Sequence, residues 1–247
     1  MTAVILMCSD PLAPRRVDPQ FAAEAEAVTA LGGRVALIDH DALLAGDSHG
    51  AVAAVPHGLG PVWYRGWMIP CHRYALLAEA LHERGVELRT SPAQYRSAHE
   101  LPGWYGTFAS LTPRSAWLPL RPHTVPGAAA LASLASRLGG GGPAVVKDYV
   151  KSRKHEWDEA AYVPEMADTA RLAAVVKRFV ELQGDFLTGG VVLRAFECFT
   201  GEEARVWWVG GEPVLVTAHP DTPQVLPRPS TGPVAPLARR LGSPPVT

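Results

Sequence analysis

Three basic side chains stand inside apolar runs of this sequence, where charged residues are uncommon. Lys147 lies in AVVKDYV, Arg194 in VVLRAFECF and Arg205 in ARVWWVGGEPVLV. A cation surrounded by Val, Leu, Phe and Trp loses hydration and needs an anion to compensate its charge. The acidic residues nearby are too few to pair with all three cations. A polyphosphate held against the face of a sheet would pair with them together, and this pattern therefore indicates a nucleotide.

Further basic residues follow Lys147 closely. Lys151, Arg153 and Lys154 lie beside His155 in the segment KSRKHEW. One hypothesis is a mobile loop that covers phosphates or contacts an acidic substrate. The alternative is a solvated basic turn, which is the usual role of a charge run. The close spacing of these cations behind an apolar strand favours the first.

Composition indicates an ordinary soluble enzyme-sized protein. The chain has 247 residues, of which 47% are hydrophobic and 19% charged, so it can bury a sizeable core. The formal net charge of -1 argues against a dedicated nucleic-acid binder. Neither a membrane-spanning run nor a signal peptide is recognisable. The three cysteines are scattered without metal-ligand spacing, and we therefore expect reduced thiols and a cytoplasmic protein.

The first hundred residues alternate between strand and helix patterns, which predicts a parallel sheet with helices on its faces. Four expected strands lie at residues 2–9, 34–40, 61–66 and 86–90, and the expected helices lie at residues 21–33, 41–46 and 71–85. Such sheets bind ligands at the carboxyl ends of their strands. Those ends carry Asp10, Asp39 and Arg65, which are either ligand contacts or structural caps.

The second half has a different pattern, so we expect two domains with a boundary in the Pro- and Gly-rich residues 100–125. The expected helices lie at residues 128–138 and 169–184, and the expected strands at residues 144–150, 191–199, 204–209 and 212–219. Gly210 and Gly211 predict a hairpin turn between the last two strands. The glycine run before Pro143 lacks a phosphate-loop motif and is interpreted as a flexible joint. The proline-rich last twenty-odd residues are expected to have no regular structure.

The order of these elements resembles the ATP-grasp superfamily. A strand lysine in VVKDYV is followed by a long helix, the strand VVLRAFE and the hairpin EARVWWVGGEPV. The segments WYRGWMIP, HELPGWYG and VKDYVKSRKHEW are also similar to segments of the clade that is named for two arginines and one lysine. The resemblance covers nearly the whole chain. It implies an α/β protein with a preATP-grasp domain at residues 1–100 and an α+β ATP-grasp-like domain at residues 101–247.

The resemblance implies ATP and Mg²⁺ as cofactors. The expected reaction phosphorylates the carboxylate of a small molecule or peptide, and an amine then attacks the acylphosphate to give an amide. Lys147 is expected to contact the α- and β-phosphates. Arg194 and Arg205 are the expected catalytic residues, because they would neutralise the transferring phosphoryl group or hold the acceptor carboxylate.

The resemblance also suggests further nucleotide contacts. Lys151 and Lys154 are expected to help to bind the cofactor. Glu197 lies where the chain in this superfamily passes the adenine and ribose, and it would bond a ribose hydroxyl; the alternative is a surface carboxylate at a strand end.

The acidic residues late in the sequence depart from the superfamily pattern. ATP-grasp enzymes usually take Mg²⁺ ligands from acidic positions on their last strands, but only Glu212 and Asp221 follow Arg205 here. The metal ligands are therefore unknown, and the chain resembles an ATP-grasp domain that lacks its last elements. The leading expectation is an ATP-dependent carboxylate-amine ligase. The alternatives are a nucleotide-binding protein without catalysis and an ATP-dependent phosphotransferase that acts on a small molecule.

Overall fold

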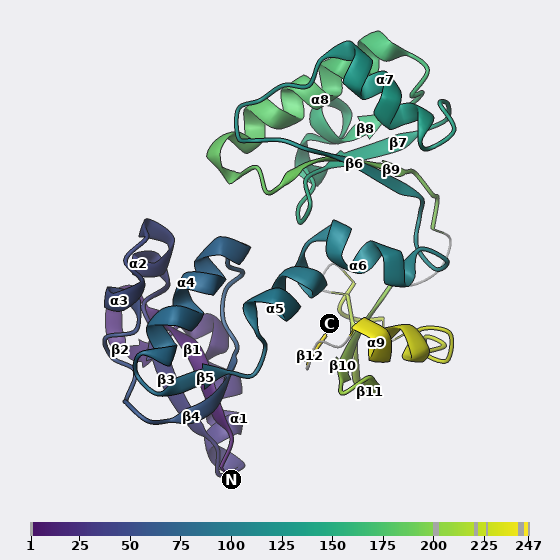
Figure 1. Ribbon diagram of the computed structural model, residues 1–247. Coiled ribbons are helices and arrows are strands. Elements are labelled where there is room, and N and C mark those ends of the chain that lie inside the picture. The colour runs from purple at the N-terminus through teal and green to yellow at the C-terminus, as the bar shows by residue number, and fades with distance from the viewer. Residues whose placement is uncertain (1, 200–202, 220–221, 226, 242–244, 247) are drawn as a thin grey trace. The chain divides into compact units, whose positions relative to one another are not determined.

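The computed structural model describes residues 2–199, 203–219, 222–225, 227–241 and 245–246. The chain divides into two compact units, the first built mainly from residues 1–96 and the second mainly from residues 97–242. Figure 1 shows both units, and each is described here by itself.

The first unit contains a five-stranded sheet with helices on both faces. Its strands are β1 (Val4–Asp10), β2 (Ala13–Val17), β3 (Arg34–Ile38), β4 (Gly60–Tyr64) and β5 (Val86–Leu88). Its helices are η1 (Pro19–Phe21), α1 (Ala22–Ala30), α2 (His40–Ala45), α3 (Ser48–Ala51), α4 (Cys71–His82) and the beginning of α5 (Pro92–His99).

The sheet of the first unit is parallel, as the sequence predicts, except for one strand. β1 pairs with β3 and β4, and β4 pairs with β5, all in parallel. The short strand β2, which the sequence pattern does not predict, pairs antiparallel with the end of β1. One core forms between the sheet and α2, α3 and α4, and a second, smaller core forms around α1.

The polar residues at the carboxyl ends of these strands make local structural contacts. The Asp39 carboxylate accepts the hydrogen bond that begins α2, and the Asp10 carboxylate accepts a backbone N–H from the turn that follows β1. The guanidinium of Arg65 donates to Glu24 over 2.6 Å and lies against the ring of Phe21. Local structural contacts therefore account for the positions of all three residues.

The second unit contains a four-stranded sheet and a separate β-hairpin. Its helices are α6 (Leu101–Phe108), α7 (Ala128–Ser136), η2 (Lys154–Glu156), the π-helical turn η3 (Trp157–Ala161), α8 (Thr169–Gln183), η4 (Gly184–Phe186) and α9 (Ala235–Leu241). Its strands are β6 (Ser115–Pro119), β7 (Ala144–Lys147), β8 (Tyr162–Val163), β9 (Gly190–Ala195), β10 (Ala204–Val209), β11 (Glu212–Ala218) and the last short strand, β12 (Pro245–Val246).

The four-stranded sheet is antiparallel throughout, in the order β6-β9-β7-β8. A second sheet has the order β11-β10-β12. The turn between β10 and β11 is formed by Gly210 and Gly211, with φ values of 59° and 83°. Both glycines adopt the left-handed backbone that a two-residue hairpin turn requires, so the predicted hairpin is confirmed.

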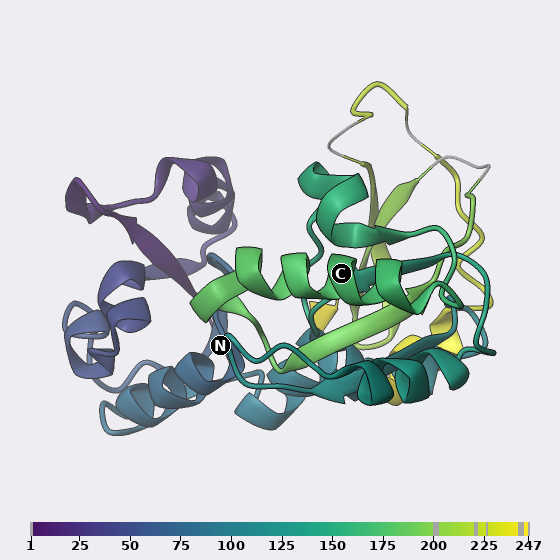
Figure 2. The ribbon, with the colours of Figure 1, turned by 90° about the horizontal axis from the view of Figure 1, so that it is seen from above.

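The helices α7 and α8 cover one face of the four-stranded sheet. In Figure 1 they lie on one side of it, and in Figure 2 the strand β9 is visible between them. α8 begins where the Asp168 carboxylate accepts the backbone N–H of Arg171, and it ends at Gly184. Its apolar residues recur at helical spacing and therefore form one stripe that faces the sheet.

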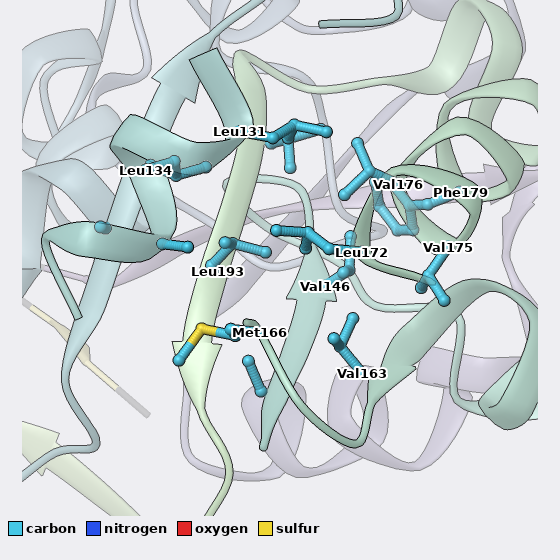
Figure 3. Close-up of a cluster of buried hydrophobic side chains, with 14 of the residues drawn as sticks. Leu131, Leu134, Val146, Val163, Met166, Leu172, Val175, Val176, Phe179 and Leu193 are labelled. Atoms are coloured by element: carbon cyan, nitrogen blue, oxygen red, sulfur yellow. The ribbon is translucent and has the colours of Figure 1, made fainter. Parts of the chain in front are cut away.

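Alternate residues of the strands meet this stripe in the largest core of the chain. The side chains labelled in Figure 3 are Leu131 and Leu134 from α7, Val146, Val163 and Leu193 from the strands, Met166, and Leu172, Val175, Val176 and Phe179 from α8. The core fixes which face of each strand turns away from the helices, because side chains alternate along a strand.

Two expectations about local structure are wrong. The segment 100–125 is not a plain connection, since it contains α6 and β6. α6 forms despite Pro102, Gly103 and Gly106 because its aromatic and apolar side chains pack against the sheet, and tertiary packing outweighs weak helix propensity. The proline-rich C-terminal residues also contain regular structure, namely α9 and β12.

Truncation of Phe179 tests the core beneath α8. Its side chain is fully buried, whereas that of Phe186 is 85% exposed. We expect Phe179→Ala to lower the free energy of unfolding by about 3–5 kcal/mol, because it removes apolar contacts and leaves a cavity. The matched control Phe186→Ala should change it by less than ~0.5 kcal/mol. Urea denaturation followed by circular dichroism measures both, and equal effects would contradict this packing.

Candidate functional site

The sheet face opposite α7 and α8 carries Lys147 and Arg194. Arg194 on β9 lies opposite Val145 on β7 and opposite Ser115 on β6. Residues that are paired across an antiparallel ladder share a face, and so do residues two apart along one strand. Lys147 and Arg194 therefore lie on the same face of adjacent strands, away from the helical core.

Neutral groups surround the guanidinium of Arg194. Its terminal nitrogens donate to the hydroxyl of Thr112 over 2.7 Å and to the hydroxyl of Ser115 over 3.3 Å. The plane of the Trp104 indole lies beside it, with 6.0 Å between the guanidinium carbon and the ring centroid. Burial lowers the pKa of Arg194 below its ordinary value, and the negative charge of Glu197 opposes this shift. No ion pair joins Arg194 to a carboxylate among the residues that the structure describes.

Lys147 is half-buried, and its charge is poorly compensated. The pKa of Lys147 is lowered to about 8, mainly by burial; the charge of Asp148 opposes this shift, and the positive charge of Arg194 adds to it. No carboxylate of the described chain forms an ion pair with this ammonium group. Two partly desolvated cations that repel each other thus lie on one sheet face, which favours binding of an anion there.

Asp148 holds the turn that follows Lys147. Its carboxylate is fully buried and accepts hydrogen bonds from the backbone N–H groups of Val150 (2.6 Å) and Lys151 (2.5 Å). It also accepts from the side chain of Gln183 at 2.8 Å and from the backbone of Thr188 at 3.3 Å. The negative charge of Asp148 is therefore distributed over these donors rather than paired with Lys147. Sequence reasoning missed this residue, although its position directly after a strand lysine is a usable signal.

An aromatic cluster lies near Arg194, around β8 and the end of β9. Tyr162 lies opposite Val145 and therefore shares the face of Arg194. The rings of Trp157 and Tyr162 are stacked, with 5.2 Å between centroids, and the ring of Phe196 meets Tyr162 edge-on at 5.2 Å. Trp157 and Phe196 are more than a third exposed, so the cluster offers apolar surface beside the cations. The sequence does not reveal this cluster, because its members are brought together by strand register.

The other predicted site residues are exposed. Lys151 and Lys154 lie in the segment after β7, and Glu197 lies just beyond β9. Arg205 is exposed on β10, in the second sheet, so the expectation that it is embedded in apolar surroundings is wrong. An apolar run along a strand therefore does not by itself bury the basic residue within it. The structure thus brings Lys147 and Arg194 together on one sheet and places Arg205 on another.

The helix α6 packs on the cation-bearing face, which the sequence pattern does not predict. Leu101 is fully buried there, and Trp104 and Tyr105 pack beside it against Val192 and Trp117. The backbone N–H of Leu101 donates to the carbonyl of Tyr149 over 2.8 Å, which ties α6 to the turn after Lys147. The predicted aromatic segment HELPGWYG is thus part of the wall around Arg194.

Mg²⁺ prefers several oxygen ligands, usually carboxylates. Across residues 2–199, 203–219, 222–225 and 227–241, no group of three or more His, Cys, Asp or Glu side chains is arranged to hold a metal ion. Glu212 instead accepts hydrogen bonds from Arg239 at 2.7 and 3.2 Å. Asp221 lies outside the described residues. The metal ligands therefore stay unassigned among the residues that the structure describes.

Comparison with known families identifies the C-terminal part of the chain. Residues 137–247 match the model for the ATP-grasp domain of family 3 in the clade that is named for two arginines and one lysine. This segment is similar to that ATP-grasp clade. The matched residues include both Lys147 and Arg194, as well as Arg205. The expected resemblance to the two-arginine, one-lysine clade is thus confirmed.

Solved structures extend the likeness to the ATP-grasp fold over nearly the whole chain. The RimK domain ATP-grasp protein from Sphaerobacter thermophilus DSM 20745 is 16% identical, with a TM-score of 0.59 over 98% of this chain and 83% of that one. The D-cycloserine synthetase DcsG is 14% identical, with a TM-score of 0.55 over 97% and 79%. The ATP-grasp ligase PsnB, complexed with minimal precursor, Mg and ADP, is 12% identical, with a TM-score of 0.52 over 98% and 82%.

No curated protein matches the sequence. Within the residues that the structure describes, none of the helices has the length and apolar character needed to cross a membrane.

The depressed pKa of Lys147 predicts a pH-dependent cost to folding. The folded pKa of about 8 lies below the ordinary value of 10.5, so the unfolded chain binds more protons between these two pH values. Stability contributed by this group therefore rises with pH across that window and is lowest below pH 8. Relative to Lys147→Met, the wild type should gain about 1–2 kcal/mol between pH 7.5 and 10.5, a value reduced for solvent screening of this half-buried group.

Chemical denaturation of the two proteins at several pH values measures this difference. The comparison with Lys147→Met cancels the titration of tyrosines and cysteines, which is common to both proteins. A stability difference that stays constant from pH 7 to 10.5 would show that Lys147 is not desolvated.

Proposed function

We propose that this protein is an ATP-dependent carboxylate-amine ligase whose nucleotide lies on the sheet face that carries Lys147 and Arg194. The observation that supports it most directly is the presence of two partly buried cations on one sheet face, with no ion-paired carboxylate in the described chain. Such a pair is costly in the absence of a ligand and suits a bound polyphosphate. The family match to the ATP-grasp domain includes both residues.

The phosphates would be held by groups of different geometry. The ammonium of Lys147 acts as a compact point charge toward the α- and β-phosphates. The planar guanidinium of Arg194 offers parallel N–H donors, which suit phosphate or carboxylate oxygens. The turn fixed by Asp148 would present the backbone and side chain of Lys151 beside Lys147, and Lys154 would add positive charge at the open side.

The nucleobase would lie against the aromatic cluster on the same sheet face. Trp157, Tyr162 and Phe196 present partly exposed rings. Tyr162 is on β8, and β7 separates it from Arg194 on β9. Apolar and aromatic walls with a few polar groups are typical of small-molecule sites. Glu197 directly follows Phe196 and would accept a hydrogen bond from a ribose hydroxyl.

The acceptor would be a small-molecule or peptide carboxylate. When bound, ATP would supply the phosphoryl group that converts this carboxylate into an acylphosphate, which an amine then attacks to give an amide and phosphate. Arg194 would stabilise the charge on the transferring group, and Arg205 would hold the acceptor carboxylate. The solved relatives include a protein named as a synthetase and another named as a ligase. We assign residues 1–100 to the preATP-grasp part of this architecture.

A nucleotide-binding protein without catalysis is the second candidate. The pairing of Glu212 with Arg239 favours it, because a carboxylate engaged by a guanidinium is less available to a metal ion. Both candidates predict nucleotide binding, but only the ligase predicts turnover with a carboxylate and an amine.

Isothermal titration with ATP tests the shared element of both candidates. Wild type should give saturable heat. Lys147→Ala should weaken binding by about 1.5–3 kcal/mol, the scale of a charge-assisted hydrogen bond, and Arg194→Met should weaken it similarly. Lys177→Ala is the matched control, because Lys177 is exposed on α8 and, within the described residues, pairs only with Glu181. The affinity of this variant for ATP should equal that of wild type.

Thermal melts of the same variants separate ligand binding from folding. We expect Lys147→Ala and Arg194→Met to remain folded, since removal of a poorly compensated cation does not weaken the core. Equal ATP affinity in wild type and both variants would overturn the proposed site. Binding without acceptor-dependent phosphate release across a panel of carboxylates and amines would support the candidate without catalysis.

A further inference from the structure

The guanidinium of Arg194 has donors to spare after its contacts with the protein are made. An arginine side chain carries five N–H donors. One terminal nitrogen of Arg194 donates to Ser115 and the other to Thr112. The remaining N–H groups have no acceptor among the residues that the structure describes. They are therefore available to an anionic ligand on the open side of the sheet.

The two hydroxyls beside Arg194 differ in what their own protons do. The Ser115 hydroxyl donates to the carbonyl of Pro113 over 3.1 Å, and the backbone N–H of Ser115 donates to the hydroxyl of Tyr105 over 3.0 Å. Ser115 is buried, so its polar groups are engaged within the protein. Its hydroxyl thus accepts from Arg194 and has no proton left for a ligand.

Thr112 is in the opposite situation. Its hydroxyl oxygen accepts from Arg194 over 2.7 Å, the shorter of the two contacts. Its own hydroxyl proton has no acceptor in the described part of the chain, and the residue is half-exposed. A hydroxyl that accepts from a guanidinium is polarised and becomes a better donor. Its proton can turn toward an oxygen that the same guanidinium contacts.

We propose that Thr112 is a further ligand-binding residue, which positions Arg194 and donates its hydroxyl proton to the same phosphate oxygen that Arg194 binds. This inference rests on the proposed function and adds a donor to that site. A neutral donor beside the arginine adds a hydrogen bond without adding charge. Trp104, against which the guanidinium lies, restricts the arginine to the orientation that Thr112 holds.

Substitutions at Thr112 test this proposal. Thr112→Val removes the hydroxyl while keeping the branched shape, and it should weaken ATP affinity about 5- to 20-fold. Thr112→Ser keeps the hydroxyl and should retain affinity within about threefold. Thr124→Val is the matched control, because Thr124 is exposed and its hydroxyl makes only a 3.5 Å contact to Pro122. Its affinity should equal that of wild type.

Titration with inorganic tripolyphosphate, which has no nucleobase, shows whether Thr112 contacts the phosphates or the nucleobase of ATP. If Thr112 contacts the anion, Thr112→Val should lose affinity for ATP and for tripolyphosphate by similar factors. In the Arg194→Met background, the same substitution should have a smaller effect, because the oxygen that both groups bind is no longer held in place.

The outcomes separate this inference from the proposed function. Normal ATP binding by Thr112→Val, with wild type binding well and Arg194→Met weakened, would overturn the role of Thr112 alone. A lower melting temperature of Thr112→Val with unchanged ATP affinity would also overturn it, since Thr112 would then contribute only to folding stability. Absence of ATP and tripolyphosphate binding in the wild type would overturn both. Loss in Thr112→Val with recovery in Thr112→Ser supports the inference.

Discussion

The proposed site in the second unit depends on two poorly compensated cations that lie on one face of an antiparallel sheet. Burial lowers the pKa of both Lys147 and Arg194, yet neither side chain forms an ion pair with a carboxylate of the described chain. The opposite face must supply the stabilising free energy that offsets this cost, and the apolar packing of α7 and α8 does so. The same register that buries Val146 and Leu193 therefore turns Lys147 and Arg194 outward.

Some groups around the two cations hold the local structure in place, whereas others keep hydrogen-bond donors available for a ligand. The Asp148 carboxylate is spread over backbone and amide donors and holds the turn after Lys147. The hydroxyl proton of Ser115 is donated to the carbonyl of Pro113, whereas the hydroxyl proton of Thr112 has no acceptor in the described chain. The aromatic cluster around Tyr162 adds apolar surface on the same face. Charge, hydrogen-bond donors and an apolar wall thus meet on one surface, as a nucleotide site requires.

Most of the elements, but little of the site geometry, could be predicted from the sequence. The long helix α8 and the glycine hairpin follow from local periodicity and turn chemistry, which depend on neighbouring residues alone. The contact between Arg194 and Thr112 spans 82 residues and exists only because β6 pairs with β9 in one register. The helix α6 forms through packing rather than propensity, so its proline and glycines misled the prediction. An apolar strand run did not distinguish a half-buried arginine from the exposed Arg205, since burial depends on what covers the strand.

The central claim is that Lys147 and Arg194 bind one polyphosphate, and a crystal structure with a non-hydrolysable ATP analogue tests it most directly. The account predicts phosphate oxygens within about 3 Å of both Lys147 Nζ and the Arg194 guanidinium, on the face opposite α7 and α8. It would be contradicted by an analogue whose phosphates are well ordered but contact neither side chain.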